Sequence, residues 1–272
     1  MWSWRPEILL PLLVVGGAYT IGWWRMAQGS ASRVPPWRLT LALGGLMSIM
    51  VALVSPLASL AQALFLAHMV QHMLLMMVAP PLLLLADPLP EILWGLPRTV
   101  RLRLGHLLVS GAPLRTAVQR LTWAPAAWLI SAVALWMWHL PAAYEAALRV
   151  DVFHDLEHGV FFWAGVLFWW PVINPGPHVR GQIPYMLRIV YLILGAFQKG
   201  LLGLLLTMSP LVLYDSYAST APVWGLSPLE DQAWGGVIMW GVGGAIDMAA
   251  VLVLLFKFFS LGEREPLPDG AI

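Results

Sequence analysis

Long apolar runs dominate the pattern of hydrophobic and polar positions, and short polar segments rich in Pro and Gly separate them. A helix needs roughly 20 apolar residues to cross the hydrocarbon core of a bilayer. The runs lack the alternation of polar and apolar residues that a membrane barrel shows, so we predict helices. Seven segments are long enough, namely residues 7–24, 37–54, 60–86, 121–140, 152–173, 184–208 and 232–259.

The composition supports an all-α, polytopic membrane protein embedded in the lipid bilayer. Hydrophobic residues make up 60% of the chain and charged residues only 11%. The formal net charge of +1 gives no reason to expect a nucleic-acid partner. The chain contains no cysteine, which excludes disulfides, Cys-ligated zinc and iron–sulfur clusters. We expect residues 1–272 to form one domain, and we interpret the first span, followed by Arg25, as a retained helix rather than a cleaved signal peptide.

Basic residues alternate between the predicted loops and indicate an orientation. The loops after the first, third and fifth spans hold most of them, namely Arg25, Arg33, Arg98, Arg101, Arg103, Arg115, Arg120 and Arg180. Residues 209–231 contain Asp215, Glu230 and Asp231 but no Lys or Arg. The positive-inside rule therefore predicts an external amino terminus and a cytoplasmic carboxyl terminus. Residues 97–120, which interleave Arg with Leu and Val, are typical of an interfacial amphipathic segment.

In this orientation, five of the seven histidines fall in the outer half of the membrane. His68 and His72 lie in the third span, His139 ends the fourth, and His154 and His158 open the fifth. Ionisable groups at that depth are costly and usually functional. We therefore predict that three helices form one metal or cofactor site near the outer face.

The spacing of His68 and His72 places both imidazoles on one helix face, and Met76 continues that stripe. Met69 and Met73 form a second line about 100° away. Imidazole combined with soft thioether favours copper over magnesium or calcium, and Cu(I) accepts either ligand type. Methionine is also a routine core filler, so direct thioether contact with the metal remains one of two alternatives.

The second histidine pair forms the pattern H-x-x-E-H with Glu157. A carboxylate beside a metal-bound imidazole fixes its tautomer, so Glu157 is a candidate orienting group. The same pattern occurs in zinc proteases, where the glutamate activates water, and a membrane zinc protease is one alternative. A haem-binding redox protein is another, because histidines on different helices can bind haem axially. A transporter is a third, although little polar sequence follows Asp247 to extend a pathway.

Several other polar residues lie inside or at the ends of the predicted spans. Lys199 and Asp247 are expected to neutralise each other across the bundle, because unpaired charge in lipid is costly. Asp231 is a candidate helix cap and a candidate support for the metal site. Gln71 and Gln232 are candidates for hydrogen bonds near that site.

The histidine motifs occur in a particular order with other short motifs. They are His68-Met69-Val70-Gln71-His72 with Pro80-Pro81 downstream, Trp138-His139-Leu140-Pro141, His154 through His158, and Asp231-Gln232 with Gly235-Gly236 and Met239-Trp240. On a seven-helix frame this series resembles the CtaG-type assembly factors of cytochrome c oxidase, those associated with caa-type oxidases. The resemblance implies a non-enzymatic protein of the bacterial cytoplasmic membrane that handles copper while the oxidase is built. Its expected partners are oxidase subunits and other copper chaperones.

Overall fold

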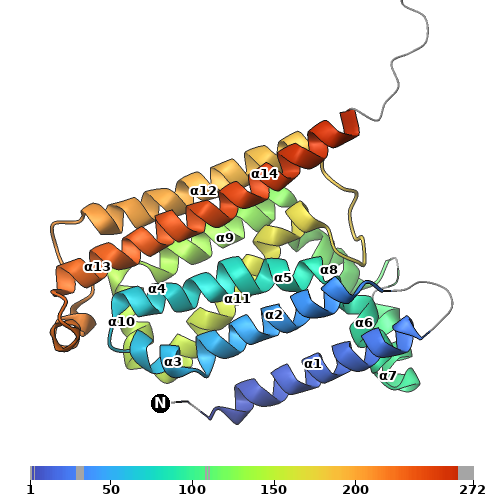
Figure 1. The fold of residues 1–272 in the computed structure, drawn as a ribbon, viewed down its shortest axis with the longest axis horizontal. Helices are drawn as coiled ribbons and strands as arrows, with labels where there is room; N and C mark the ends of the chain where they lie inside the picture. The colour runs from blue at the N-terminus through green and yellow to red at the C-terminus, as the bar shows by residue number, and fades with distance from the viewer. Residues whose placement is uncertain (1, 3, 29–33, 108, 110, 263–272) are drawn as a thin grey trace, which may run out of the picture.

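The computed structural model describes residues 2, 4–28, 34–107, 109 and 111–262, and helices make up most of them. The long helices run side by side along the longest axis of the molecule (Figure 1). No β-strand occurs in these residues, which confirms the all-α prediction.

The helices follow one another along the chain in a fixed order. They are α1 (Pro6–Ala27), α2 (Pro36–Leu53), α3 (Pro56–Ala61), α4 (Phe65–Met73), the π-helix η1 (Leu74–Val78), α5 (Ala79–Leu85), α6 (Pro88–Gly95), α7 (Arg98–Leu107), α8 (Pro113–Leu121), α9 (Ala124–Trp138), α10 (Pro141–Arg149), α11 (Asp151–Ile173), α12 (Tyr185–Met208), the 3-10 helices η2 (Asp215–Tyr217) and η3 (Ala221–Trp224), α13 (Pro228–Val237), the π-helix η4 (Ile238–Val242) and α14 (Gly243–Gly262).

Within the described ranges, six continuous helices are long and apolar enough to cross a membrane. A seventh span results if α8 and α9, which meet at a bend of 70°, count as one. The predicted segment 121–140 therefore corresponds to α9 plus this bend, because Pro125 sits in the first turn of a helix that restarts after Trp123. The predicted segment 60–86 is also shorter in the structure: a separate helix, α3, ends at Ala61, and α4 begins at Phe65.

The outward face of the bundle is apolar. Phe256 is 74% exposed, Phe197 70% and Leu13 69%. An apolar surface of this extent suits lipid rather than water.

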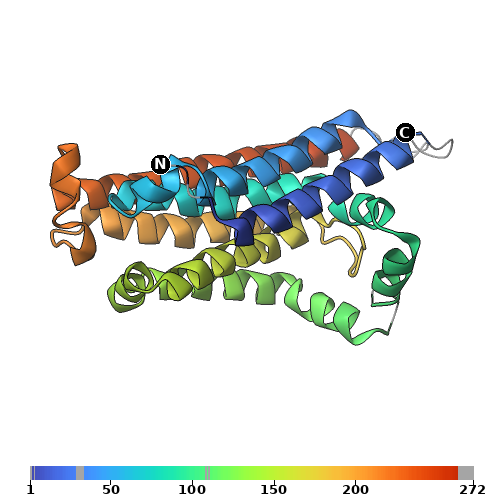
Figure 2. The ribbon, with the colours of Figure 1, turned by 90° about the horizontal axis from the view of Figure 1, so that it is seen from below.

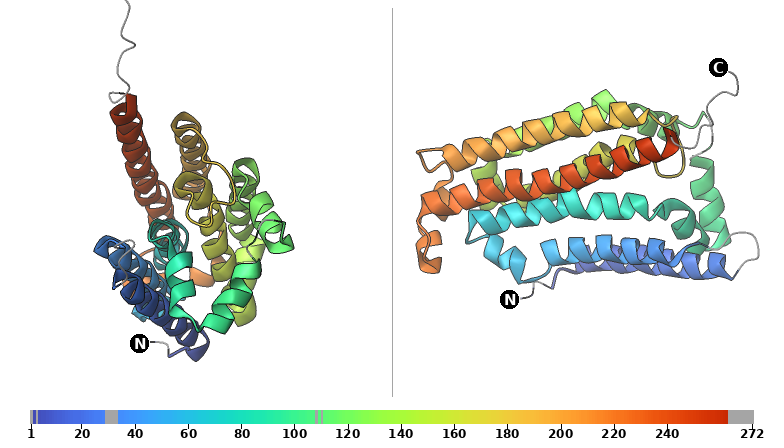
Figure 3. Two further views of the ribbon diagram at one scale, coloured as in Figure 1. Left: turned by 90° about the vertical axis from the view of Figure 1, so that its right-hand side faces the viewer. Right: turned by 45° about the horizontal axis from the view of Figure 1, so that its top comes forward.

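The helices that carry the candidate residues pack closely against one another. In Figures 1 and 3, α4, η1 and α5 lie in the middle of the bundle, between α1 and α2 on one side and α12 and α14 on the other. A Cβ added at Gly165 of α11 would lie 2.6 Å from the Met76 carbonyl oxygen, so only glycine lets α11 rest against η1. A Cβ at Gly235 of α13 would collide with the Phe65 ring of α4.

The short elements gather at the two ends of the bundle. One end carries α3, α10, η2, η3 and the start of α13, and the opposite end carries α6, α7 and α8 (Figures 1 and 2). The first end holds the loops predicted to be external, and we call it the loop end. The acidic segment 209–231 and the arginine-rich segment 97–120 thus lie at opposite ends, as the predicted orientation requires.

A pair of single-cysteine variants tests the orientation, because the native chain has no cysteine. Val223 is 82% exposed at the loop end, and Thr99 is exposed on α7. In intact right-side-out vesicles, an impermeant thiol reagent should label Val223→Cys and should label Thr99→Cys only after permeabilisation. The reverse pattern would place the loop end in the cytoplasm.

Candidate metal centre

Four imidazoles gather around one buried carboxylate near the loop end. His68 and His72 come from α4, and His154, His158 and Glu157 come from α11. Ring centroids are 4.3 Å apart within each histidine pair. Between the two helices, the His68 ring lies 5.2 Å from that of His154 and 5.8 Å from that of His158, and the His72 and His158 rings are 5.6 Å apart. The i, i+4 spacing on two packed helices therefore produces one cluster.

Glu157 lies beside His68 and His72 in this cluster and is 0% exposed. Its Oε2 lies 3.8 Å from Nε2 of His68, and its Oε1 lies 3.7 Å from Nε2 of His72. Both separations are too long for hydrogen bonds. When ionised, a buried carboxylate needs a compensating partner, and a bound cation would supply it here.

The other donor atoms of the cluster share this lack of partners. Among the described residues, the buried side-chain atoms of the cluster without a hydrogen-bond partner are Nε2 of His68, Nε2 of His154, both ring nitrogens of His72 and of His158, and both oxygens of Glu157. Two triads bring one donor atom from each member to within 4.8 Å of one another. They are His68, His154 and His158, and His68, His72 and Glu157. The residues therefore fit a metal ion held by imidazole and carboxylate, and His68 belongs to both triads.

His139 lies beside the cluster rather than inside it. Its Nδ1 donates to the Leu135 carbonyl at 2.8 Å, which leaves Nε2 as the acceptor nitrogen. Its ring centroid is 6.2 Å from that of His72. The Phe161 ring packs against both, with its centroid 4.3 Å from that of His72 and 5.9 Å from that of His139.

Two tyrosines outside the predicted motifs hold His68 from the opposite side. The His68 Nδ1 lies 2.7 Å from the Tyr144 hydroxyl and 2.9 Å from the Tyr217 hydroxyl. The two hydroxyls are 3.0 Å apart, and Tyr217 donates to the Ala61 carbonyl at 3.1 Å. Burial raises the pKa of both phenols, so both keep their protons.

One arrangement of protons satisfies this whole network. His68 Nδ1–H donates to Tyr144, Tyr144 donates to Tyr217, and Tyr217 donates to Ala61. In that tautomer the lone pair of His68 lies on Nε2, which faces Glu157. The tyrosines would then leave the Nε2 lone pair of His68 available to a metal ion.

Residues 209–227 fold back over the cluster. Tyr214 donates to the His139 carbonyl at 2.9 Å. The backbone N–H of Ser216 donates to Glu145 of α10 at 3.0 Å. Burial alone would raise the pKa of Glu145, but hydrogen bonds from Ser216 outweigh it and keep the pKa below its usual value. Three of the six tyrosines in the chain lie in the two segments at this end, and this clustering was the available sequence signal.

Asp231 caps the helix that carries His68 and His72. Its Oδ2 accepts from the Phe65 N–H at 2.7 Å, and its Oδ1 accepts from the Leu66 N–H at 3.0 Å. The first N–H groups of α4 otherwise have no side-chain cap. Asp231 therefore supports the histidines through the backbone of α4, from a different helix.

Both glutamines bind backbone groups. Gln71 Nε2 donates to the Ala52 carbonyl at 2.8 Å and so ties α4 to α2. Gln232 Oε1 accepts from Leu213 N at 2.7 Å, and its Nε2 donates to the Leu211 carbonyl at 3.1 Å. These bonds place the glutamines in the framework around the site, and the structure gives them backbone partners in place of the predicted hydrogen bonds near the metal.

The remaining predicted residues lie below the cluster, where below means farther from the loop end. Lys199 and Asp247 form the expected buried ion pair, with Nζ 2.8 Å from Oδ2 and 3.0 Å from Oδ1. Met69, Met73 and Met76 line a small cavity next to His72 and His139.

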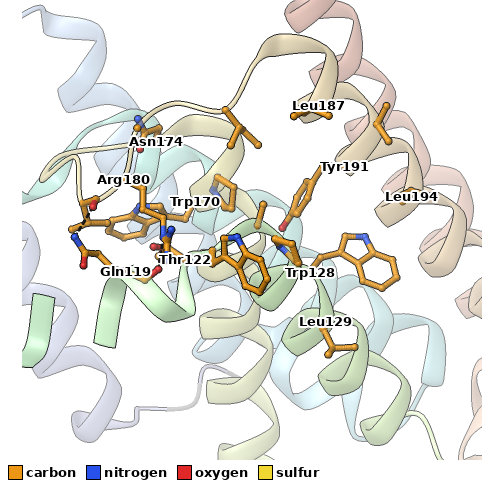
Figure 4. Close-up of a pocket in the computed structure, with 18 residues that line it drawn as sticks. Gln119, Thr122, Trp128, Leu129, Trp170, Asn174, Arg180, Leu187, Tyr191 and Leu194 are labelled. Atoms are coloured by element: carbon orange, nitrogen blue, oxygen red, sulfur yellow. Dashed lines mark hydrogen bonds between the residues drawn. The ribbon is translucent and has the colours of Figure 1, made fainter. Parts of the chain in front are cut away.

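A much larger cavity of about 1020 Å³ lies at the opposite end of the bundle (Figure 4). Trp128, Trp170 and Tyr191 form much of its wall, and Gln119 and Arg180 lie at its polar side. No histidine or carboxylate is among the described residues that line it, so this cavity is separate from the histidine cluster at the loop end.

The fold and the site together define a polytopic helical membrane protein with a buried histidine and carboxylate cluster. The chain belongs to the family of cytochrome c oxidase caa3 assembly factors, whose family model matches residues 17–260. This match confirms the resemblance that the sequence motifs indicated.

Similar proteins occur in mycobacteria. An uncharacterized protein of Mycobacterium leprae is 25% identical over 267 residues, which cover 93% of this chain and 38% of that protein. Uncharacterized proteins of Mycobacterium bovis and Mycobacterium tuberculosis are each 27% identical over 245 residues, covering 85% of this chain and 35% of theirs. The chain thus spans little more than a third of the length of these relatives. No solved structure matches the chain.

The capping role of Asp231 predicts a loss of stability on truncation. Asp231→Ala should lower the free energy of unfolding in detergent by about 1–2 kcal/mol, the usual scale for loss of a helix cap. Asp215→Ala, which removes an exposed carboxylate from the same end, is the matched control and should change it little. Equal effects of the two substitutions would contradict the capping role.

Proposed function

We propose that this protein is a copper-binding assembly factor of cytochrome c oxidase. In this proposal it acts in the bacterial cytoplasmic membrane, holds copper at the histidine cluster with Glu157, and passes it to oxidase subunits or other copper chaperones. The assembly role follows from the family. The observation that carries the metal role is the convergence of buried, unpartnered imidazole nitrogens and carboxylate oxygens within the described part of the chain.

The donor set and its neighbours favour copper. Imidazole suits zinc, copper and iron, whereas thioether selects copper. Met69, Met73 and Met76 adjoin His72, so soft ligands are within reach of the nitrogen cluster. When bound, the metal would supply the positive charge that the buried Glu157 carboxylate lacks.

The geometry favours holding and transfer over the alternative functions. Glu157 is fully buried and faces His68 and His72, whereas a protease needs a base that reaches a substrate and water. Haem needs axial histidines on opposite sides of a broad planar group. Here Phe161 packs against both His72 and His139, and the other rings surround one small space. Two triads that share His68 give an ion more than one ligand set within the same cluster.

Removal of the histidine pair of α4 tests the metal role. His68→Ala combined with His72→Ala should remove most of the copper from the purified protein, while insertion and folding persist because apolar packing holds the bundle. His106→Ala combined with His178→Ala changes two exposed histidines and should leave copper content unchanged. Elemental analysis of each variant gives the answer. Wild-type copper in the first double variant, or stoichiometric zinc with rejection of copper in the wild type, would refute the proposal.

Replacement of Glu157 separates metal support from catalysis. Glu157→Gln keeps an oxygen but removes the charge, so copper affinity should fall about 10- to 100-fold, the usual scale for groups that support a metal ligand. Competition with a Cu(I) chelator measures this change. Unchanged affinity, together with loss of cleavage of a membrane substrate, would instead assign Glu157 as the base of a protease.

A further inference from the structure

The small cavity described above, next to His72 and His139, lies directly below the histidine cluster and has a volume of about 30 Å³. That volume suits one small ion or a water molecule or two. His72 and His139 form its upper rim, and each has a ring nitrogen without a hydrogen-bond partner among the described residues. Five methionines line the rest, and we call the space the thioether chamber; they are Met69, Met73, Met76, Met77 and Met239.

Two π-helices contribute to the wall of this chamber. Met76 and Met77 belong to η1, and Met239 belongs to η4. A π-helix closes its hydrogen bonds over five residues, so His72 and Met77, five positions apart, both reach the same cavity. π-helices are rare and frequently occur at functional sites. The presence of two π-helices at one small cavity therefore points to a functional site, and it does so independently of the methionines.

The methionines of the chain are concentrated at this chamber. Five of the 13 methionines in the chain line the chamber. Gly243, just after η4, leaves space that the Met73 side chain approaches: a Cβ there would lie 3.7 Å from Met73 Sδ. Thioether sulfur is neutral and polarizable, and it binds Cu(I) in preference to harder ions. The wall therefore offers soft ligands without burying any further charge.

A buried ion pair closes the chamber on the side away from the histidines. The Lys199 ammonium lies 3.4 Å from Met77 Sδ and is held by Asp247. It also lies 4.3 Å from the centroid of the Phe168 ring. Asp247 neutralises this ammonium, so the ion pair closes the chamber without adding net charge to its wall. An ion that enters the chamber from the histidine cluster therefore passes His72 and His139.

We propose that the thioether chamber is a second metal site, selective for Cu(I), which exchanges its ion with the histidine cluster through His72 and His139. The inference rests on the proposed function in one respect, that copper is the metal of the cluster. The nitrogen and carboxylate ligands above bind either oxidation state of copper, whereas the sulfur ligands below favour the reduced one. The two sites in series thus separate copper by oxidation state.

Counting Cu(I) ions tests the chamber. The purified full-length protein is titrated with Cu(I) under anaerobic conditions against a chelator, and sulfur neighbours of copper are measured by X-ray absorption. The wild type should bind two Cu(I) per chain and show sulfur neighbours. The triple variant Met73→Leu, Met76→Leu, Met239→Leu should bind one and lose most of the sulfur signal, because only Met69 and Met77 of the five thioethers remain. Leu fills nearly the same volume, so the packing should persist. The retained ion also shows that this variant is folded.

Matched variants separate the possible failures. Met186, Met208 and Met248 are exposed on the apolar surface, so the triple Met186→Leu, Met208→Leu, Met248→Leu should keep both ions and the sulfur signal. If the chamber variant also keeps both, the chamber is only packing, and the inference falls. The proposed function then still stands if His68→Ala with His72→Ala loses an ion. A wild type that binds no Cu(I) at all overturns both.

Discussion

The carboxylate of Glu157 imposes the main constraint on this structure. It is fully buried, and its oxygens lie 3.7 and 3.8 Å from imidazole nitrogens, beyond hydrogen-bonding distance. The ionised form of such a group is stable only where the surroundings supply positive charge. The neighbouring elements hold ligands around it: Asp231 fixes the start of α4, and Gly165 allows α11 to approach η1. The helices are therefore organised around a buried carboxyl group whose oxygens have no hydrogen-bond partner among the described residues.

The same framework combines two kinds of ligand in adjacent layers. Near the loop end, imidazoles lie beside the Glu157 carboxylate, and below them thioethers line a small cavity. His72 borders both layers. Each layer relies on helix geometry: an α-helical spacing of four aligns His68 with His72, whereas the wider π turn of η1 brings Met77 beside His72. Membrane helices can present different chemistry at different depths by this change in winding.

Apolar length and histidine spacing were enough to predict the helical fold and the coming together of His68, His72, His154 and His158. The break between α3 and α4 was missed, because residues 60–64 before Phe65 are apolar apart from Gln62 and were interpreted as part of one continuous span. Tyr144 and Tyr217 were missed because they are far from His68 in sequence and reach it only through the folded loop. Met77 was missed because periodicity assumed α-helical winding, which η1 does not follow. Pairing of Lys199 with Asp247 was predictable, since buried charges in lipid need partners.

The folded-back segment 209–227 has a kinetic consequence. Tyr217 of that segment touches His68, and Ser216 attaches it to Glu145. An ion that leaves toward the loop end must wait for this segment to open locally, and each opening breaks the hydrogen bonds of the tyrosine pair. The residence time of the ion is then governed by the frequency of opening as much as by the strength of its ligand bonds. In the proposed function, a partner protein that bound this segment would accelerate release without touching the ion, so docking would set the time of delivery.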